Sequence, residues 1–343
     1  MLVNKFPDRS ISIDNKNYIY FGGTAYLGLA THIEFQNQLI QSIKKWGTFY
    51  GSSRNSNIKL SIYNKFEDFF AEQIGAEAVL TLSSGTLAGG LVVDFLSNKI
   101  QTFFHYPKTH PAVLAKHSLP LLVDGKLHPK LLDETTEEIV ITVDAILGLE
   151  VKPTSFDFFE QIPDHKTITL VIDESHSLGI IGEKSQGIYN TIQHKKIQRK
   201  IMIASLGKAL SLSGGIIAGD QTFIDALKNE PVFVSSSSAN PAYLETYINT
   251  QHLYKEQQEK LKHNLAFLGK HLQLQNKIKF NQDYPVIYCE DIAIFDALFK
   301  AGIVITNFKY PTYENIMNRI VITANHTKND LQILVQLLHK HLC

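Results

Sequence analysis

Strand-like and helix-like stretches alternate along the chain from about residue 78 to residue 218. Short apolar runs rich in β-branched residues predict buried strands, and the longer stretches between most of them predict crossover connections. This alternation favours an α/β fold with a mostly parallel sheet flanked by helices, because parallel strands need long connections. The predicted strands are Val79–Leu82, Gln101–Phe104, Leu119–Val123, Ile139–Val143, Ile168–Ile172, Ile201–Ala204 and Ile216–Ala218.

The segments on either side of this region have a different character. Residues 1–35 predict an N-terminal arm with a short strand at Tyr18–Phe21, and apolar residues at helical spacing predict an amphipathic helix over 59–74. After about residue 242, a long helical region precedes short strands, and a final helix starts near Lys328. The strands expected there lie near Val286–Tyr288, Ile303–Thr306 and Arg319–Thr323.

These patterns predict a division of the chain into three parts. We expect an arm over residues 1–35, a large ligand-binding domain over 36–241 and a small C-terminal α+β domain over 242–343.

Composition narrows the possible classes of function. The 343 residues include 33 basic and 33 acidic side chains, so no excess positive charge attracts nucleic acid or an anionic membrane. No apolar run approaches the length of a membrane span, and the N-terminus lacks the apolar core of a signal peptide. The cysteines, Cys289 and Cys343, imply no disulfide framework. A cytoplasmic enzyme fits this composition.

Two predicted strands are followed directly by residues suited to catalysis. Lys208 comes shortly after Ile201–Ala204, and Asp173 and His176 follow Ile168–Ile172. Ligands of such sheets bind outside the carboxyl ends of the strands, so we expect these side chains to share one crevice. A lysine, an acid and a histidine there suit pyridoxal 5'-phosphate (PLP) chemistry. The lysine forms the Schiff base, and the acid keeps the pyridine nitrogen protonated.

Each of these residues also has a simpler interpretation. Asp173 could cap a strand end, and His176 could bond a backbone carbonyl. Ser84, Gly85 and Thr86 follow a strand and open a predicted helix, which suits a phosphate cradle or a plain N-cap. No P-loop pattern is present, so ATP is not the expected ligand.

His110 lies in a loop after a predicted strand, where an imidazole could stack on a flat cofactor ring. His105, His110 and His117 share no helical face, and no cysteine or carboxylate completes a ligand set, so we expect no metal.

In this order, the motifs resemble the α-oxoamine synthases, a family of fold-type-I PLP enzymes. The matching segments are Tyr26–Leu29, Ser84–Gly85, Asp173–Gly179, and Ser205 with Lys208. The resemblance covers nearly the whole chain. It implies PLP as cofactor, a homodimer with active sites at the interface, and decarboxylative condensation of a small amino acid with an acyl thioester.

The resemblance also implies a role for each matching residue. Lys208, Asp173, His176 and His110 would serve catalysis by forming the Schiff base, pairing with the ring nitrogen, contacting the ring oxygen and stacking on the ring. Cofactor phosphate would be held by Ser84, Gly85, Thr86, Ser205 and, from the second subunit, Ser237, whereas Arg319, Thr312 and Thr24 would contact substrate.

The chain departs from the family where the acyl donor is expected. The family's glycine-rich loop corresponds to Gly47–Arg54, which carries Phe49 and Tyr50, and Tyr63 replaces an expected histidine. A serine expected within Asp144–Leu149 is missing. The predicted cofactor end is therefore intact and the acyl-donor end altered.

Three functions remain open from the sequence. The first is the synthase reaction. The second is an aminotransferase, or other chemistry at Cα with a partner that is not a CoA thioester. The third is a non-catalytic subunit, although such a subunit would be expected to lose Lys208.

Overall fold

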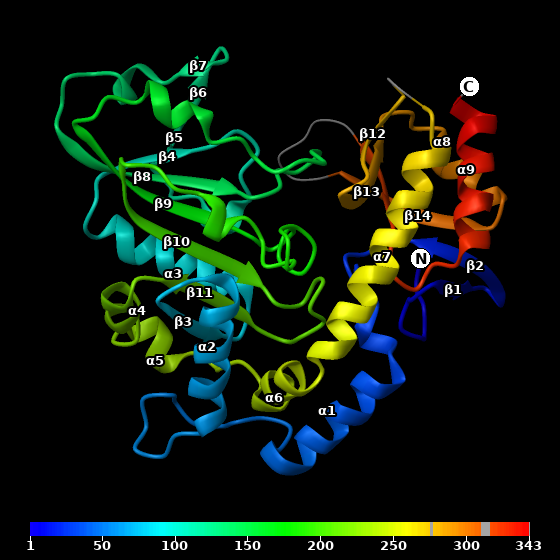
Figure 1. The fold of residues 1–343 in the computed structure, drawn as a ribbon, viewed down its shortest axis with the longest axis horizontal. Coiled ribbons are helices and arrows are strands. Elements are labelled where there is room, and N and C mark those ends of the chain that lie inside the picture. Colours follow the sequence, from blue (N-terminus) through cyan, green and yellow to red (C-terminus); the bar gives the residue numbers. More distant parts are fainter. Residues whose placement is uncertain (275–276, 310–315, 343) are drawn as a thin grey trace.

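The computed structural model describes residues 1–274, 277–309 and 316–342, which form two lobes, each built on its own sheet (Figure 1). The larger lobe holds a seven-stranded sheet, and the smaller lobe holds a six-stranded sheet together with the N-terminus and the last helix. Helices α1 (Ile33–Trp46) and α7 (Gln251–His271) run along the side of the molecule where the lobes meet.

The larger sheet is mostly parallel, as the sequence predicts. Strand β11 runs antiparallel to both of its neighbours, and the remaining pairings are parallel. Across the sheet the order is β3 (Ala78–Leu82), β11 (Gly215–Gly219), β10 (Ile197–Ser205), β9 (Lys166–Asp173), β8 (Glu137–Asp144), β4 (Thr102–His105) and β5 (Leu119–Pro120).

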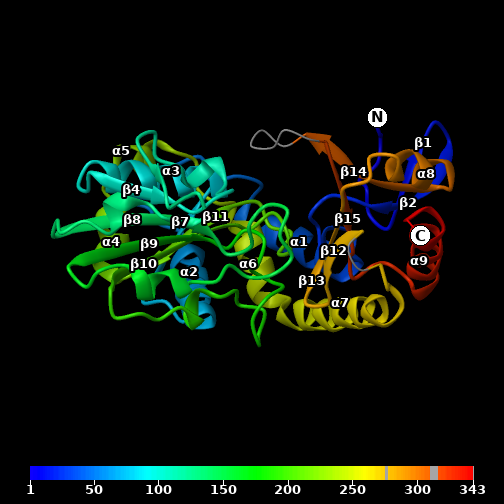
Figure 2. The same ribbon diagram turned by 90° about the horizontal axis from the view of Figure 1, so that it is seen from above.

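Helices cover this sheet on both sides (Figure 2). Helix α3 (Gly85–Ser97) packs on β10 and β11, and α2 (Ser61–Ile74), predicted over 59–74, packs on β3. The central strands are buried along most of their length. Because both of their faces are covered, their sequences are nearly continuous apolar runs. The connections from β8 to β9 and from β9 to β10 contain short 3-10 turns, η4 (Asp157–Gln161) and η5 (Tyr189–Thr191).

One predicted strand is wrong. Residues Leu119–Val123 split into β5, which joins the large sheet, and β6 (Leu122–Val123), which pairs with β7 (Lys126–Leu127) in a separate hairpin. Pro120 has no N–H to donate to a ladder, so the strand ends there. Asp124 and Gly125 have φ values of 49° and 75°, which suits a tight hairpin turn.

The smaller sheet joins strands from the two ends of the chain. Strand β2, which contains the predicted strand Tyr18–Phe21, pairs in parallel with β14, so the predicted arm contributes to the same sheet as the C-terminal strands. The order is β1 (Ser10–Ile13), β2 (Lys16–Phe21), β14 (Ile303–Lys309), β15 (Ile316–Val321), β13 (Tyr284–Cys289) and β12 (Ile278–Asn281).

The remaining helices border the two sheets. They are α4 (Gln221–Leu227), α5 (Pro231–Ser235), α6 (Pro241–Asn249), α8 (Ile294–Lys300) and α9 (Lys328–Leu342), together with the turns η1 (Leu29–Thr31), η2 (Pro111–Val113) and η3 (Pro129–Leu131). None of the helices within the described ranges is long and apolar enough to cross a membrane.

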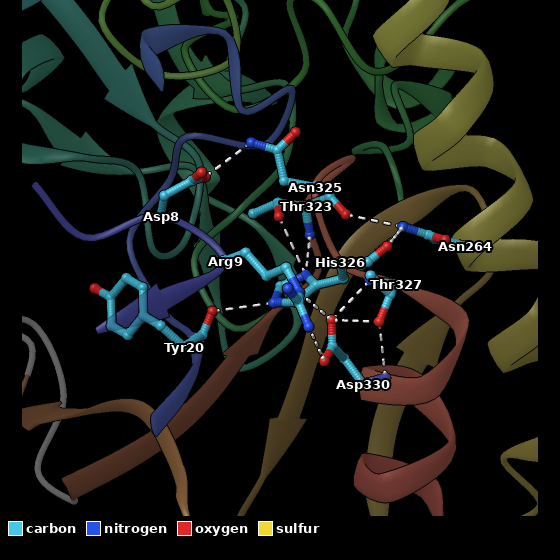
Figure 3. Close-up of polar contacts among 9 residues, drawn as sticks. All are labelled: Asp8, Arg9, Tyr20, Asn264, Thr323, Asn325, His326, Thr327 and Asp330. Atoms are coloured by element: carbon cyan, nitrogen blue, oxygen red, sulfur yellow. Dashed lines mark hydrogen bonds and ion pairs between the residues drawn. The ribbon is translucent and has the colours of Figure 1, made fainter. Parts of the chain in front are cut away.

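A partly buried ion pair ties the N-terminal segment to α9 (Figure 3). Arg9 donates through Nε and Nη2 to the two carboxylate oxygens of Asp330, at 2.7 and 3.1 Å. Asp330 also accepts from the backbone N–H of Thr327 at 2.7 Å, and its own N–H donates to the Thr327 hydroxyl. This reciprocal pair is a capping box, so one carboxylate both starts the last helix and anchors the first segment.

His326, beside this ion pair, links the same parts of the chain through neutral hydrogen bonds. Its Nδ1 accepts from the Thr323 N–H at 2.9 Å, and its Nε2 donates to the Tyr20 carbonyl at 3.0 Å. The ring stacks on Phe21 with centroids 4.0 Å apart. Burial lowers the pKa of His326 to about 4, because a charged ring would be desolvated and would lose its acceptor nitrogen.

We predict that His326 makes stability fall in mild acid. An ordinary histidine pKa is near 6.5 in the unfolded chain, so the native state resists protonation between about pH 6.5 and 4. The stabilisation is therefore present above pH 6.5 and is lost as pH falls towards 4, by about 3 kcal/mol at most. Urea unfolding at several pH values should show a shallower decline for His326→Gln than for wild type. Replacing the exposed His263 with glutamine is the matched control, and an equal decline in wild type and His326→Gln would contradict the prediction.

Candidate active site

The carboxyl ends of the parallel strands in the large sheet meet at one edge, which faces the smaller lobe (Figure 1). Asp144 at the end of β8 lies in register with Asp173 at the end of β9, and Asp173 pairs with Ile203 of β10. The residues at or just after the ends of three neighbouring strands therefore lie in the same space, as expected for this class of sheet.

Lys208 is presented by a closed turn after β10. The Leu206 N–H donates to the Gly214 carbonyl at 3.0 Å, and the Leu212 N–H returns to the Leu206 carbonyl at 3.0 Å. Burial lowers the pKa of the Lys208 amine, while the nearby carboxylates of Asp173 and Asp144 oppose that shift. The lysine is thus half-buried with acids beside it. Such surroundings are typical of a group that alternates between its charged and neutral forms.

Asp173 lies among these groups, as predicted. Its side chain is nearly buried, and its Oδ1 accepts from the Ser175 N–H at 2.8 Å. The Ser175 hydroxyl in turn accepts from the Ser205 N–H at 2.8 Å, which connects the end of β9 to the end of β10.

Asp144 is a second buried acid that the sequence reasoning did not select. Its Oδ1 accepts from the His110 N–H at 3.1 Å, so it fixes the loop that carries His110. Burial raises the pKa of Asp144 well above its usual range, and the charge of Asp173 raises it further. The available signal was its position: Asp144 follows the apolar β8 just as Asp173 follows β9.

His110 begins the 3-10 turn η2, where its Nδ1 accepts from the Ala112 N–H at 3.1 Å. Burial lowers its pKa, although Asp173 acts in the opposite direction. His176 lies across the same space, with its Nδ1 2.9 Å from the Tyr26 hydroxyl oxygen. Both predicted histidines line one cavity together with Asp144 and Arg319.

Glu174, next to Asp173, has a structural role. The carboxylate is fully buried and accepts from the backbone N–H groups of Ile188 and Tyr189 at 2.8 and 2.6 Å, and from the Ser177 hydroxyl. Burial raises the pKa of Glu174 to about 7. It holds the loop after β9 against the end of the strand and does not line the cavity with His176.

The start of α3 lies against the end of β10. Ser84 caps the helix by accepting from the Leu87 N–H at 3.1 Å. A Cβ on Gly85 would come within 2.9 Å of Ser205, so only glycine allows this approach. The first-turn N–H groups of Gly85 and Thr86 have no partner within the helix, and together with the helix dipole they suit an anion such as phosphate.

Arg319 reaches the cavity from β15 of the smaller sheet. Its Nη2 lies 3.5 Å from the Gly23 carbonyl, while its buried Nε has no hydrogen-bond partner among the described residues. The guanidinium lies 5.4 Å from the centre of the Phe308 ring. A buried, unpaired guanidinium donor is costly unless a ligand satisfies it, which suits binding of a carboxylate.

The other predicted site residues show fewer contacts with this site. Thr24 is half-buried in the loop before Tyr26, and Thr86 is exposed. Ser237 is exposed in the segment after α5. Thr312 lies outside the described residues. In the residues that the structure describes, no group of three or more histidine, cysteine or acidic side chains could hold a metal ion.

The altered loop near Gly47–Arg54 packs by means of its polar side chains. Arg54 forms a two-point ion pair with the buried Glu67, at 2.5 and 3.0 Å, and stacks over Tyr63 at 4.3 Å. Tyr50 donates to a backbone carbonyl at 2.7 Å with its ring 6.3 Å from that of Tyr63, whereas Phe49 is 61% exposed. Tyr50 therefore packs against the core, whereas Phe49 lies mostly in solvent.

Comparison with known proteins identifies the family. Residues 154–338, more than half of the chain, match the model described as aminotransferase class I and II. The chain belongs to this family. It is a PLP-dependent transferase of the α-oxoamine synthase-like type, as the sequence predicted.

Individual relatives extend the similarity over nearly the full length. The 8-amino-7-oxononanoate synthase of Thermosipho melanesiensis is 25% identical over 96% of this chain and 89% of its own. Serine palmitoyltransferase from S. paucimobilis with a bound PLP–myriocin aldimine superposes with a TM-score of 0.81 at 15% identity, covering 98% of this chain and 90% of that one. The 8-amino-7-oxononanoate synthase of Francisella tularensis gives 0.72 at 21% identity, covering 94% and 97%. These structural likenesses confirm the predicted fold.

We predict that Asp173 sustains the charge of Lys208 in the cofactor-free protein. Removing its negative charge in Asp173→Asn should lower the pKa of Lys208 further, because burial would then be less opposed. The rate of Lys208 acetylation, followed by peptide mass spectrometry against pH, should therefore reach half its maximum at a lower pH than in wild type. Asp144→Asn is the matched control and should have the smaller effect, since burial favours the protonated form of Asp144. An equal or larger effect of the control would overturn the assignment.

Proposed function

We propose that this protein condenses a small amino acid with an acyl thioester, with loss of CO2, in the manner of an α-oxoamine synthase. The observation that supports this most directly is that the turn carrying Lys208 follows the strand next to Asp173, while Arg319 lines the adjoining cavity with both histidines. A lysine, an acid and a carboxylate-binding arginine are the groups that PLP chemistry at an amino-acid Cα requires.

The residues present fit PLP. Bound to the protein, PLP would supply an electron sink for charge that develops at Cα. In this proposal Lys208 holds it covalently, Asp173 accepts the ring N–H, His110 stacks on the ring and His176 contacts the ring oxygen. The phosphate contacts come from Ser84, Gly85, Thr86 and Ser205.

Lys208 is also the proposed general base. Its amine would take the proton from the amino-acid Cα. The lowered pKa of Lys208 supports this role, because it increases the neutral fraction that can accept a proton. Arg319 holds the amino-acid carboxylate, and the proposed substrate contacts of Thr24 and Thr312 would add to that orientation.

The direct test is a product assay with glycine, alanine and serine as donors and a panel of acyl thioesters. The proposal expects stoichiometric release of CO2 and free thiol, and no release from Lys208→Ala. If thiol release and CO2 are absent with every pair, the synthase assignment fails.

We predict that ordinary CoA thioesters are poor substrates. Tyr50 and Tyr63 place two rings where the family's loop and histidine would receive the acyl donor, and Phe49 adds bulk at the loop surface. The kcat/KM with acetyl-CoA and longer acyl-CoAs should lie below roughly 10⁴ M⁻¹s⁻¹, with smaller or carrier-bound thioesters preferred. Phe49→Gly combined with Tyr50→Gly should raise the value for CoA thioesters. Efficient turnover of acetyl-CoA by the wild type would contradict this.

A second candidate is an aminotransferase, which the altered acyl-donor loop favours. Lys208, Asp173 and Arg319 would act in the same way on the amino acid, but a 2-oxo acid would replace the thioester. Transfer of ¹⁵N from a labelled amino acid to a 2-oxo acid, without CO2 release, would identify this reaction.

We also propose that the protein is a homodimer in which Ser237 completes the neighbour's phosphate site. The segment that contains Ser237 is exposed in the single chain, and exposed apolar side chains lie nearby on contacting segments: Phe49, Ile58, Val232 and Val234. The hydroxyl of Tyr63 contacts the Ser238 hydroxyl at 2.5 Å and donates to the Ala239 carbonyl at 2.9 Å, which holds this segment in place.

We predict a dimer by light scattering at micromolar concentration. Ser237→Ala should raise the Kd for PLP about tenfold, since a hydrogen bond to a charged group contributes about 1.5–3 kcal/mol. The neighbouring Ser235→Ala is the control, because the Ser235 hydroxyl donates to the Pro231 carbonyl within α5. A monomer with full PLP affinity would contradict the proposal.

A further inference from the structure

His176 is held as a neutral imidazole. Burial lowers its pKa well below the usual value, and the positive charges of Lys208 and Arg319, together with His110, lower it further. A neutral imidazole has one N–H donor and one acceptor nitrogen, so its function depends on which nitrogen carries the hydrogen.

The Tyr26 hydroxyl decides between the two tautomers. Its oxygen lies 2.9 Å from His176 Nδ1, and the Tyr26 side chain is 1% exposed. The ring of the buried Tyr284 packs beside Tyr26, with centroids 6.3 Å apart. In the described part of the chain, the hydrogen-bond partner of this buried hydroxyl is His176 Nδ1, so Tyr26 directs its hydrogen to that nitrogen, because a buried hydroxyl without an acceptor would be costly.

The backbone around Tyr26 is held by the smaller lobe. The Tyr26 carbonyl accepts from the Ala324 N–H at 2.9 Å, and the Leu27 carbonyl accepts from Gln257 of α7 at 2.7 Å. Gly28, which has a φ of 62°, packs directly against Asn325. The hydroxyl that contacts His176 is thus positioned by elements outside the large sheet.

We propose that Tyr26 is a positioning residue that fixes His176 in the tautomer with the hydrogen on Nε2. The assignment of the tautomer stands on the hydrogen bonds above. Its use rests on the proposed function: the Nε2–H would donate to the ring oxygen of bound PLP, so the hydrogen bond from Tyr26 would orient the ring that contacts the cofactor. The hydrogen bond that Nδ1 accepts from Tyr26 leaves the hydrogen on Nε2. Histidines that bind metals are fixed in one tautomer in the same way, by a partner on the other ring nitrogen.

The tautomer can be measured without cofactor. In protein labelled with ¹⁵N-histidine, long-range ¹H–¹⁵N correlation should show His176 protonated at Nε2, with an Nδ1 resonance shifted by hydrogen bonding; His176→Gln identifies the signals. Tyr26→Phe should move the Nδ1 resonance towards the position of a nitrogen that accepts no bond. Tyr247→Phe, which removes a buried hydroxyl that donates to Gln73, is the control and should leave these signals unchanged.

A second readout uses the absorption band of PLP-loaded protein, which Tyr26→Phe should shift and Tyr247→Phe should not. Hydrogen on Nδ1 in the wild type, or an Nδ1 resonance unaffected by Tyr26→Phe in a folded variant, would overturn the proposal. If the tautomer is as predicted but PLP does not bind, the assignment to Tyr26 is supported and the proposed function alone fails.

Discussion

The register between β8, β9 and β10 is the constraint on which the site depends. Asp144 and Asp173 are paired across adjacent parallel strands, and the turn that carries Lys208 begins where the next strand ends. A slip of one residue would exchange the faces to which these side chains point. The apolar residues that bury both faces of these strands therefore fix the chemistry as well as the fold.

The same register also brings the carboxyl groups of Asp144 and Asp173 close to each other and to Lys208. Two acids and one lysine share a buried space, and two ionised acids would exceed the charge of the lysine. Burial shifts the pKa of Asp144 upwards and that of Lys208 downwards, so both are driven towards their neutral forms. The carboxylate of Asp173 accepts a hydrogen bond from the Ser175 N–H. Such opposed shifts are typical of functional sites, and the Asp144 carboxyl meanwhile accepts the backbone N–H of His110.

The sequence predicted those parts of the site that follow from local sequence patterns. Lys208 and Asp173 follow apolar strands, and their convergence was predicted from that fact alone. Arg319 was identified by its resemblance to a family motif, but its place beside the cavity depends on β15, and the parallel pairing of β2 with β14 joins segments from opposite ends of the chain. The contact of Tyr26 with His176 spans 150 residues and has no local signal. Leu119–Val123 was wrongly predicted as one strand because its apolar pattern outweighed the missing N–H of Pro120.

The central claim is that Lys208 is the residue that binds the cofactor. Incubating the protein with PLP, reducing it with borohydride and mapping its peptides tests this directly. The account predicts a single pyridoxyl mass addition on the peptide that contains Lys208, and its loss in Lys208→Ala. Attachment to another lysine, or no uptake of PLP by the folded protein, would contradict it.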